Sequence, residues 1–127
     1  MSVLAHGVDL IECRRIAEIL ERHGERFVER ILTSRERVYV CSRRLPIPHL
    51  AGRFAAKEAI LKALGTGWRG RVSWHDMEII NDSAGRPSVA LTGESSRIAE
   101  RLGIRRVLIS ITHTKDHAVA SAIALGE

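Results

Sequence analysis

Hydrophobic and polar residues follow two different periods along this chain. The N-terminal stretch "SVLAHGVDLI" alternates loosely at every second position, as strands do, and Ile16, Ile19 and Leu20 then recur at helical spacing. After residue 71 the two-residue period returns. The pattern predicts these elements: a first strand from Val3 to Asp9; helices over about Cys13 to His23, 25–32, 33–43, Leu50 to Leu64 and 96–103; and strands at 73–82, 88–93, 106–113 and 117–125.

Several short signals mark where these helices begin and end. Gly24 follows the first helical pattern and ends it. Thr33 precedes Glu36 by three residues, which is the spacing of a capping box. Ser95 or Ser96 is expected to cap the helix that Gly103 closes. We therefore expect well-defined helix boundaries in both halves of the chain.

Two prolines precede the longest helix. Pro46 and Pro48 each constrain the backbone, so residues 44–50 are expected to be a loop that leads into a helix starting at about Leu50. At the other end of the chain, a turn around Lys115 and Asp116 joins the last two strands. The elements together predict a single α+β domain over residues 1–127, with mostly antiparallel strands and the long helix lying on the sheet.

The long helix has faces of different chemistry. Phe54, Glu58 and Lys62, spaced by four, share one narrow face. Lys57 lies at the edge of the apolar arc, where its stem is expected to lie along the core with its amine in water. The "GTG" at 65–67 ends the helix and allows a ligand to approach the backbone. The apolar arc, which lets a sheet approach closely, consists of Ala55, Ala56, Ala59, Ile60, Leu61, Ala63 and Leu64.

Composition narrows the classes of protein. The 127 residues carry a formal charge of +5, which predicts an acidic partner: nucleic acid, a phosphorylated ligand or an acidic protein. No apolar run is long enough to span a membrane, and the N-terminus lacks the layout of a signal peptide. We expect a cytoplasmic protein in which Cys13 and Cys41 are buried, reduced thiols.

Glu58 and Lys62 allow two interpretations. One is a surface i,i+4 ion pair worth about 0.3–0.5 kcal/mol. The other is a site in which Glu58 holds a hard cation and Lys62 faces an oxyanion, which requires a second carboxylate. Asp9, an acid in an otherwise apolar strand, is the best candidate, although it could instead cap the following helix. Glu12 is a weaker alternative for the same role.

His113 closes an apolar strand between Thr112 and Thr114 and is a further candidate. Ser110 is three residues away, and successive strand residues alternate faces, so a Ser–His nucleophile pair has poor geometry here. The sequence has no Walker-type glycine loop and no zinc-spaced set of Cys or His. Taken alone, His113 fits a satisfied strand-end residue better than a catalytic one.

Taken together, these residues resemble a known family. "GVDLIECRRI", "ILTSRE", "AGRFAAKEAILKALGTG", "IINDSAGRPSVALTG" and "ISITHTKDHAVASAIA" occur in the order and spacing of the short bacterial holo-acyl-carrier-protein synthases, the small class of 4′-phosphopantetheinyl transferases. The resemblance covers nearly the whole chain. It implies transfer of phosphopantetheine from coenzyme A to a serine of acidic apo acyl carrier protein, in fatty acid biosynthesis, with release of adenosine 3′,5′-bisphosphate. It also implies a homotrimer with active sites between subunits.

The resemblance assigns roles to individual residues. It implies Mg²⁺ as the cofactor, held by Asp9 and Glu58. The catalytic residues it implies are Glu58, Lys62 and His113. The residues it implies for coenzyme A are Arg53, Lys62, Gly65, Thr66, His113 and Thr114. The residues it implies for carrier-protein docking are Arg14, Arg15 and Arg22.

Three questions stay open at this point. The serine proton needs an acceptor, which is Glu58, directly or through a water, or else His113. A basic nucleic-acid-binding module without catalysis is the alternative function, although the resemblance implies neither a nucleic-acid nor a membrane partner. A structural protein, in which Glu58 and Lys62 form only a surface pair, is a third class.

Overall fold

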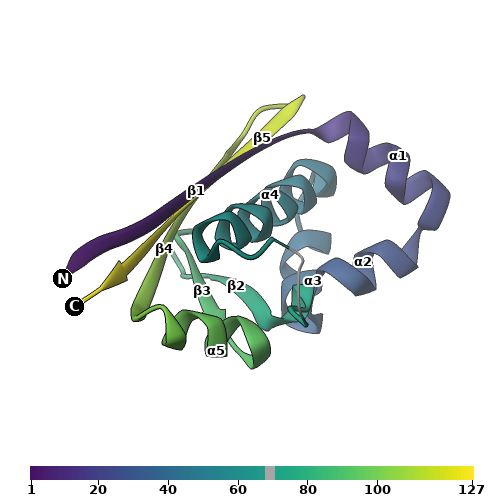
Figure 1. The fold of residues 1–127 in the computed structure, drawn as a ribbon. Helices are drawn as coiled ribbons and strands as arrows, with labels where there is room; N and C mark the ends of the chain where they lie inside the picture. Colours follow the sequence, from purple (N-terminus) through teal and green to yellow (C-terminus); the bar gives the residue numbers. More distant parts are fainter. Residues whose placement is uncertain (68–70) are drawn as a thin grey trace.

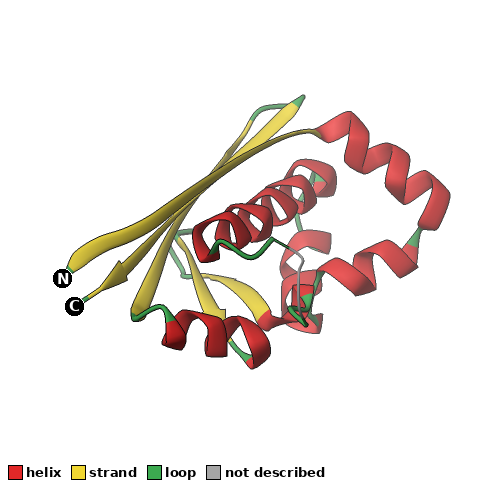
Figure 2. Ribbon diagram, in the orientation of Figure 1, coloured by secondary structure: helices red, strands yellow, loops and turns green. Residues whose placement is uncertain are grey.

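The structure, a computed structural model, describes residues 1–67 and 71–127 (Figures 1 and 2). Its helices and strands confirm the α+β class and follow the expected order. In chain order the elements are β1 (Ser2–Glu12), α1 (Cys13–His23), α2 (Glu25–Ile31), α3 (Ser34–Cys41), α4 (Pro46–Leu64), the 3-10 helix η1 (Trp74–Asp76), β2 (Met77–Asn81), β3 (Pro87–Leu91), α5 (Gly93–Arg101), β4 (Ile104–His113) and β5 (His117–Gly126).

The strands form two antiparallel sheets. One has three strands in the order β1-β5-β4, and the other is the hairpin β2-β3. Ser2 pairs with Gly126, so both termini lie at the same end of the larger sheet (Figure 1). The β4–β5 turn falls at Lys115 and Asp116, as expected. The predicted antiparallel pairing is confirmed.

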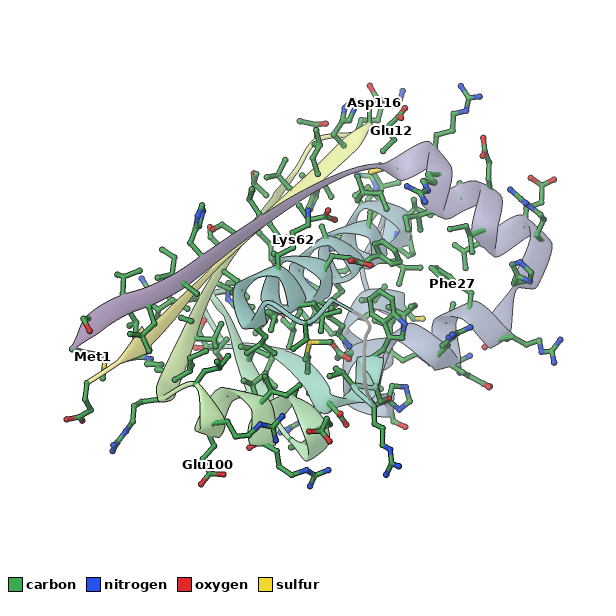
Figure 3. The ribbon with its side chains drawn as sticks, in the orientation of Figure 1. Met1, Glu12, Phe27, Lys62, Glu100 and Asp116 are labelled. Carbon is green, nitrogen blue, oxygen red and sulfur yellow. The ribbon has the colours of Figure 1, made fainter. Side chains whose placement is uncertain are left out.

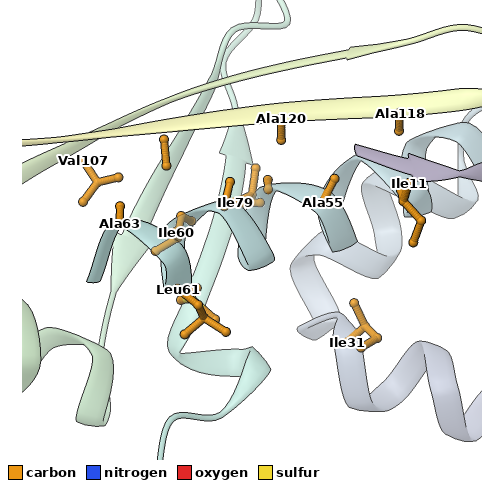
Figure 4. Close-up of a cluster of buried hydrophobic side chains, with 14 of the residues drawn as sticks. Ile11, Ile31, Ala55, Ile60, Leu61, Ala63, Ile79, Val107, Ala118 and Ala120 are labelled. Atoms are coloured by element: carbon orange, nitrogen blue, oxygen red, sulfur yellow. The ribbon is translucent and has the colours of Figure 1, made fainter. Parts of the chain in front are cut away.

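Helix α4 packs on the inner face of the three-stranded sheet. The β2-β3 hairpin, α3 and α5 lie on the side of α4 that faces away from β1 and β5 (Figure 1). Ala55 and Ala63 of α4 point toward Ala118 and Ala120 of β5 (Figure 4). All four are almost completely buried. Because methyl groups have little depth, the helix lies close to the sheet along its whole length. The expected apolar arc of the long helix is confirmed.

The other face of this sheet is partly apolar. Leu10 is 63% exposed, Val8 49% and Leu108 40%. Cross-strand pairing brings the residues of this face into rows, with Leu10 opposite Val119 and Val8 opposite Ser121. We call this surface the outer sheet face; it consists of Val8, Leu10, Leu108, Ser110, Thr112, Val119, Ser121 and Ile123.

The start of α4 differs from the sequence prediction. The helix begins at Pro46, not at about Leu50, and both Pro46 and Pro48 lie in its first turn. The first four N–H groups of a helix have no intrahelical acceptor, so proline costs little there and its fixed φ suits the helix. The two prolines begin the helix rather than delay it.

Two other boundaries were also wrong. Residues 74–76 form the 3-10 helix η1, and strand β2 starts only at Met77. The N-cap of α5 is Thr92, without a side-chain cap, instead of Ser95 or Ser96. The Ser95 hydroxyl, inside the first turn, donates to the carbonyls of Asp76 and Thr92 at 3.0 and 2.8 Å. The capping box of Thr33 and Glu36 is present as predicted.

Lys57 does not reach water, contrary to expectation. Its side chain is fully buried, and its ammonium donates to Glu36 Oε1 at 2.7 Å and to the Ile31 carbonyl at 2.7 Å. Burial lowers the pKa of Lys57, and the carboxylate of Glu36 opposes that shift. Lys57 therefore connects α4 to α2 and α3 inside the core.

Both cysteines are free thiols, as expected. Cys13 is buried at the start of α1, whereas Cys41 is exposed at the end of α3, so the expectation of burial was wrong for Cys41. Desolvation raises the pKa of the Cys13 thiol. In the described part of the chain, no helix combines the length and apolar character that crossing a membrane requires.

Candidate functional site

Asp9 lies on the face of β1 that covers α4. Gly7, Asp9 and Ile11 point toward the helix, whereas Val8 and Leu10 point away from it. Gly7 lies against Ala59 of α4, and Glu12 at the other end of the strand lines a pocket with Ile47. The strand thus runs toward the N-terminal end of α4.

The Lys62 ammonium joins β1 to α4. It donates to the Val8 carbonyl at 2.9 Å and to Asp9 Oδ1 at 3.1 Å. Figure 3 shows Lys62 on the side of α4 that faces β1. The Asp9 side chain is mostly buried and that of Lys62 is half-exposed, so this pair is open to solvent on one side.

Glu58 belongs to the same cluster. From Ala51 to Leu64, only Phe54, Glu58 and Lys62 are not buried, which confirms the predicted face. Glu58 precedes Lys62 by one helical turn, about 5.4 Å along the axis. Strand β1 crosses α4 at Gly7 and then runs toward the start of the helix. Asp9 follows Gly7 by two residues, so it lies on the same side of this crossing as Glu58.

The two alternatives for Asp9 and Glu12 are resolved by the helix that follows β1. The N-cap of α1 is Glu12, and no side chain caps this helix, so Asp9 is not a cap. Glu12 is an odd number of residues from Asp9 along β1 and is exposed. Of the two acids, Asp9 is therefore the one on the face of β1 that covers α4, where it contacts Lys62.

The end of α4 continues this cluster. Gly65 adopts the left-handed conformation with φ 78°, and its N–H donates to the carbonyls of Leu61 and Lys62. A cap of this kind turns the chain sharply after the last helical residue. Thr66 therefore follows directly beyond Lys62, with its side chain partly exposed.

His113 lies in a different part of the molecule. Its ring contacts that of His49 at 4.7 Å between centroids, in an edge-to-face arrangement. Burial, His113, Arg43 and Arg53 together lower the pKa of His49. A pocket of about 600 Å³ lies here and has no acidic residue in its lining: Ser42, Arg43, Arg44, Leu45, Pro48, His49, His113, Thr114 and Lys115.

Thr114 has a structural function in this pocket wall. Its hydroxyl accepts the backbone N–H groups of Asp116 and His117 at 3.2 and 3.1 Å, and so shapes the β4–β5 turn. The Asp116 carbonyl in turn accepts the Cys13 N–H at 2.8 Å. The turn therefore holds His113 and Thr114 near the start of α1.

Arg53 is buried, with 3% of its surface exposed. Its guanidinium donates to the Ile79 carbonyl at 3.2 Å and to Asn81 Oδ1 at 2.7 Å, and it lies over the Tyr39 ring. Burial lowers the pKa of Arg53, and Glu36 opposes this shift. In the isolated chain Arg53 thus stabilises the fold, and its contact with a phosphate stays a prediction.

The predicted site residues fall into two groups within one chain. Asp9 contacts Lys62 in the C-terminal half of α4, with Glu58 one turn earlier on the same helical face, whereas His113 contacts His49 near the start of α4. Thirteen residues separate His49 from Lys62, which is about 20 Å of helix. One chain does not bring His113 to Lys62.

Sequence reasoning missed the side chains around His113 and Arg53. Tyr39, Arg43 and His49 carry no motif of their own, and their contacts depend on how α3 and the start of α4 pack. The buried Glu36–Lys57 pair was also missed. A lysine inside an alanine-rich arc was the signal that could have revealed it, because such a position requires a buried acid.

The three docking candidates on α1 differ in whether their charge is already paired. Arg14 is paired with Glu18 at 3.0 Å, one turn later on the same helix. Arg15 and Arg22 are exposed and form no ion pair with any described residue. Their charges are therefore available to an approaching acidic surface.

No group of three or more His, Cys, Asp or Glu side chains is arranged to hold a metal ion within residues 1–67 and 71–127. The Lys62 ammonium, however, donates to the Asp9 carboxylate and the Val8 carbonyl, so two oxygen atoms already contact a cation here. Carboxylate and carbonyl oxygens suit Mg²⁺, which usually takes one or two carboxylates and completes its shell with phosphates and waters. As carboxylates, Asp9 and Glu58 are the residue type that suits such an ion, and their holding it stays a prediction.

Comparison with known proteins defines the class. Residues 5–122 match the sequence profile described as the 4'-phosphopantetheinyl transferase superfamily, and the chain belongs to this enzyme superfamily. This match confirms the resemblance seen in the sequence and identifies the protein as a transferase.

Within this superfamily, the chain is similar to individual holo-[acyl-carrier-protein] synthases. The chain is 50% identical over 124 residues to a holo-[acyl-carrier-protein] synthase of Desulforudis audaxviator, covering 98% of this chain and 94% of the relative. It is similar to the crystal structure of this enzyme from Neisseria meningitidis, with a TM-score of 0.88, 36% identity and coverage of 98% and 99%. A Bacillus anthracis enzyme in complex with CoA (3',5'-ADP) has a TM-score of 0.81, 36% identity and 98% coverage of both chains.

Proposed function

We propose that this protein is a holo-acyl-carrier-protein synthase, which transfers phosphopantetheine from coenzyme A to a serine hydroxyl of apo acyl carrier protein. The second product is adenosine 3′,5′-bisphosphate. The observation that carries this proposal is the contact between Lys62 and Asp9 beside Glu58, three ionic groups on two elements that belong to a phosphopantetheinyl transferase fold.

Mg²⁺ is the metal that these residues fit. Asp9 and Glu58 would hold it, and when bound it would neutralise charge on the pyrophosphate of coenzyme A. Lys62 supplies fixed positive charge at the same place. Since a pyrophosphate reaction requires positioning and charge neutralisation more than covalent chemistry by the protein, these groups suit such a reaction.

Glu58 is the better placed of the two candidate acceptors for the serine proton. It is one turn from Lys62 on the same helical face, whereas His113 is about 20 Å away along α4 in the same chain. A carboxylate within hydrogen-bond reach of the hydroxyl, directly or through a water, can accept the proton. His113 could do so only from a neighbouring subunit.

A homotrimer with its sites between subunits accounts for the separation of the two groups. The pocket around His113 contains several basic residues, and with Arg53 and Thr114 it would contact phosphates of coenzyme A whose pyrophosphate lies at Lys62, Gly65 and Thr66 of another subunit. The outer sheet face offers an apolar surface for subunit contact.

Helix α1 would dock the carrier protein. Arg15 and Arg22 are exposed, and Arg14 could exchange its contact with Glu18 for an acidic group of the partner. Attraction between this helix and an acidic carrier would accelerate encounter and weaken with salt. We place the reaction in the cytoplasm and in fatty acid biosynthesis, with no nucleic-acid or membrane partner.

Mass spectrometry tests this function directly. The protein is mixed with coenzyme A, MgCl₂ and an apo acyl carrier protein, and the carrier is expected to gain one phosphopantetheine on its serine. A carrier variant whose serine is replaced by alanine is the control and should gain nothing. An unmodified wild-type carrier, together with tight salt-sensitive binding of random duplex DNA, would instead favour the nucleic-acid-binding alternative.

A further inference from the structure

Strand β1 and helix α4 approach each other closely at Gly7. A Cβ atom built on Gly7 would lie 2.1 Å from the Ala59 carbonyl oxygen, 2.9 Å from the Ala63 nitrogen and 3.0 Å from Lys62 Cβ. The first two are backbone atoms, which cannot rotate out of the way. Only glycine therefore permits this separation between the strand and the helix.

The crossing at Gly7 adjoins the cluster of ionic side chains. Asp9 is two residues further along β1 on the same face, and Lys62, whose Cβ contacts the crossing, donates to Asp9 at 3.1 Å. Glu58 is one turn earlier on the same side of α4. The distance between strand and helix at Gly7 thus sets the distance between the two carboxylates.

We propose that Gly7 is a positioning residue that holds Asp9 and Glu58 at the separation needed to share one divalent cation. This inference rests on the proposed function. Moving a Cβ from 2.1 Å to the 3.4 Å at which ordinary van der Waals contact begins requires a displacement of about 1.3 Å between strand and helix. Mg²⁺ demands near-ideal octahedral geometry, so its binding is sensitive to such a displacement.

Gly7→Ala is the direct test. The backbone at Gly7 has no positive φ, so alanine can adopt its conformation and the contact with α4 is the main change. Weakened metal support typically lowers affinity about 10- to 100-fold, and a misplacement of about 1 Å can lower the rate about 100-fold. We expect both effects, with the KM for carrier protein changed by less than about twofold.

Gly52→Ala is the matched control. Its added Cβ would lie 2.8 Å from Ile111 Cγ2, the end of a side chain that can shift, and Gly52 is in the same helix but packs against β4. Ile111 Cγ2 is the one atom outside the neighbouring helix backbone that this Cβ would meet within 4 Å, so it would meet no atom of β1. Gly52→Ala should therefore affect stability alone and leave the dependence on Mg²⁺ as in wild type.

Two readouts are compared in full-length wild type and variants. One is the Mg²⁺ concentration that gives half-maximal transfer, and the other is Mn²⁺ binding followed by electron paramagnetic resonance in the presence of coenzyme A. Gly7→Ala should weaken both at least about 10-fold. Adding Asp9→Glu to Gly7→Ala should restore part of the Mn²⁺ affinity, because the longer side chain spans the added gap.

The results separate this inference from the function on which it rests. If wild type neither binds Mn²⁺ nor transfers phosphopantetheine, the proposed function fails. If wild type does both and folded Gly7→Ala matches it, Gly7 has no positioning role. If Gly7→Ala does not fold, the milder Ala63→Ser adds one atom to the helix side of the crossing, and normal Mn²⁺ affinity in that variant also overturns the inference.

Discussion

The Lys62 ammonium lies 3.1 Å from the Asp9 carboxylate, although 53 residues separate the two in sequence. Ion pairs open to solvent contribute about 0–1 kcal/mol to stability, so folding alone gives little reason for this arrangement. The Lys62 ammonium and the Asp9 carboxylate meet on the helical face that also carries Glu58, one turn earlier. Under the proposed function, the pair belongs to a site for a metal and a charged substrate.

Glu58→Gln should reduce kcat for phosphopantetheine transfer by at least about 100-fold, as should Asp9→Asn. Each change replaces a proposed charged ligand of Mg²⁺ with a neutral amide of the same shape, so the free energy of unfolding should change by less than about 1 kcal/mol. Steady-state kinetics and denaturant unfolding measure the two effects.

Glu100→Gln is the control for the loss of one negative charge, since Glu100 is exposed on α5, outside the proposed site. It should retain wild-type turnover. If Glu58→Gln is as active as Glu100→Gln, Glu58 neither holds the metal nor accepts the serine proton.

Much of the fold could be predicted from the sequence because its periods and caps are local. The alanines of α4, the Thr33 and Glu36 capping box and the β4–β5 turn each need only neighbouring residues to be recognised. Pro46 was misjudged because proline has opposite effects in the first turn and in the interior of a helix, and local sequence does not say which applies.

The candidate site could be predicted only in part. Phe54, Glu58 and Lys62 share a face because of helical spacing alone, so their relation was predictable. The burial of Arg53 and Lys57 depends on Glu36 reaching them from another helix, which no local pattern encodes. The contact of His49 with His113 likewise arises from tertiary packing.

Arg15→Ala should raise the KM for carrier protein about three- to tenfold, which corresponds to about 0.6–1.4 kcal/mol, and leave the KM for coenzyme A nearly unchanged. The reason is that Arg15 is exposed and forms no ion pair with a described residue. Initial rates at several salt concentrations should show a weaker salt dependence in the variant than in wild type.

Arg97→Ala provides the comparison for Arg15. Arg97 is exposed on α5 and lies 3.7 Å from Glu94, so it shares the residue type but not the location. Its removal should not affect the KM for carrier protein. Equal effects of Arg15→Ala on both substrates would contradict a docking role.

Glu36→Gln should lower the free energy of unfolding by about 3–5 kcal/mol. Glutamine preserves the capping box, but Lys57 and Arg53 would stay buried without their anionic partner. Adding Lys57→Met should recover part of the loss, because it removes one of the two unpaired charges. Denaturant unfolding of both single variants and the double variant gives the coupling energy.

Glu18→Gln tests whether burial of the ion pair is the reason for the large loss of stability expected in Glu36→Gln. It breaks the exposed ion pair with Arg14 and should cost only about 0.3–0.5 kcal/mol. A similar cost for Glu36→Gln and Glu18→Gln would mean that the buried network contributes no more than a surface pair.

His49 should make the protein less stable in acid. Burial is the main reason why the pKa of His49 lies below the ordinary 6.5, and the charges of His113, Arg43 and Arg53 lower it further. Tyr39 also packs against the His49 ring, and Arg44 and Lys115 line the same pocket. The unfolded chain therefore binds more protons than the folded chain below about pH 6.5. Stability should fall as the pH drops through 6.5, and level off below the folded-state pKa.

His49→Gln should reduce the slope of unfolding free energy against pH between about pH 7 and 5. If wild type and His49→Gln show the same slope, His49 is not the group responsible for the acid sensitivity.

Leu108→Glu should dissociate the proposed homotrimer. Leu108 is 40% exposed on the outer sheet face, in a row with Ile123 of β5, so a charge there would be buried by a subunit contact. The same charge on an isolated chain would stay in water, so each subunit should remain folded. Analytical ultracentrifugation should show a trimer for wild type and a monomer of 14.1 kDa for the variant.

Val38→Glu distinguishes loss of the interface from a general effect of added charge. Val38 is more exposed than Leu108 but lies on α3, across the molecule from the outer sheet face. It should leave both assembly and transfer intact, whereas Leu108→Glu should lose both because His113 of one subunit would no longer reach the coenzyme A bound at Lys62 of another. A monomeric Leu108→Glu with wild-type activity would show that one chain contains a complete site.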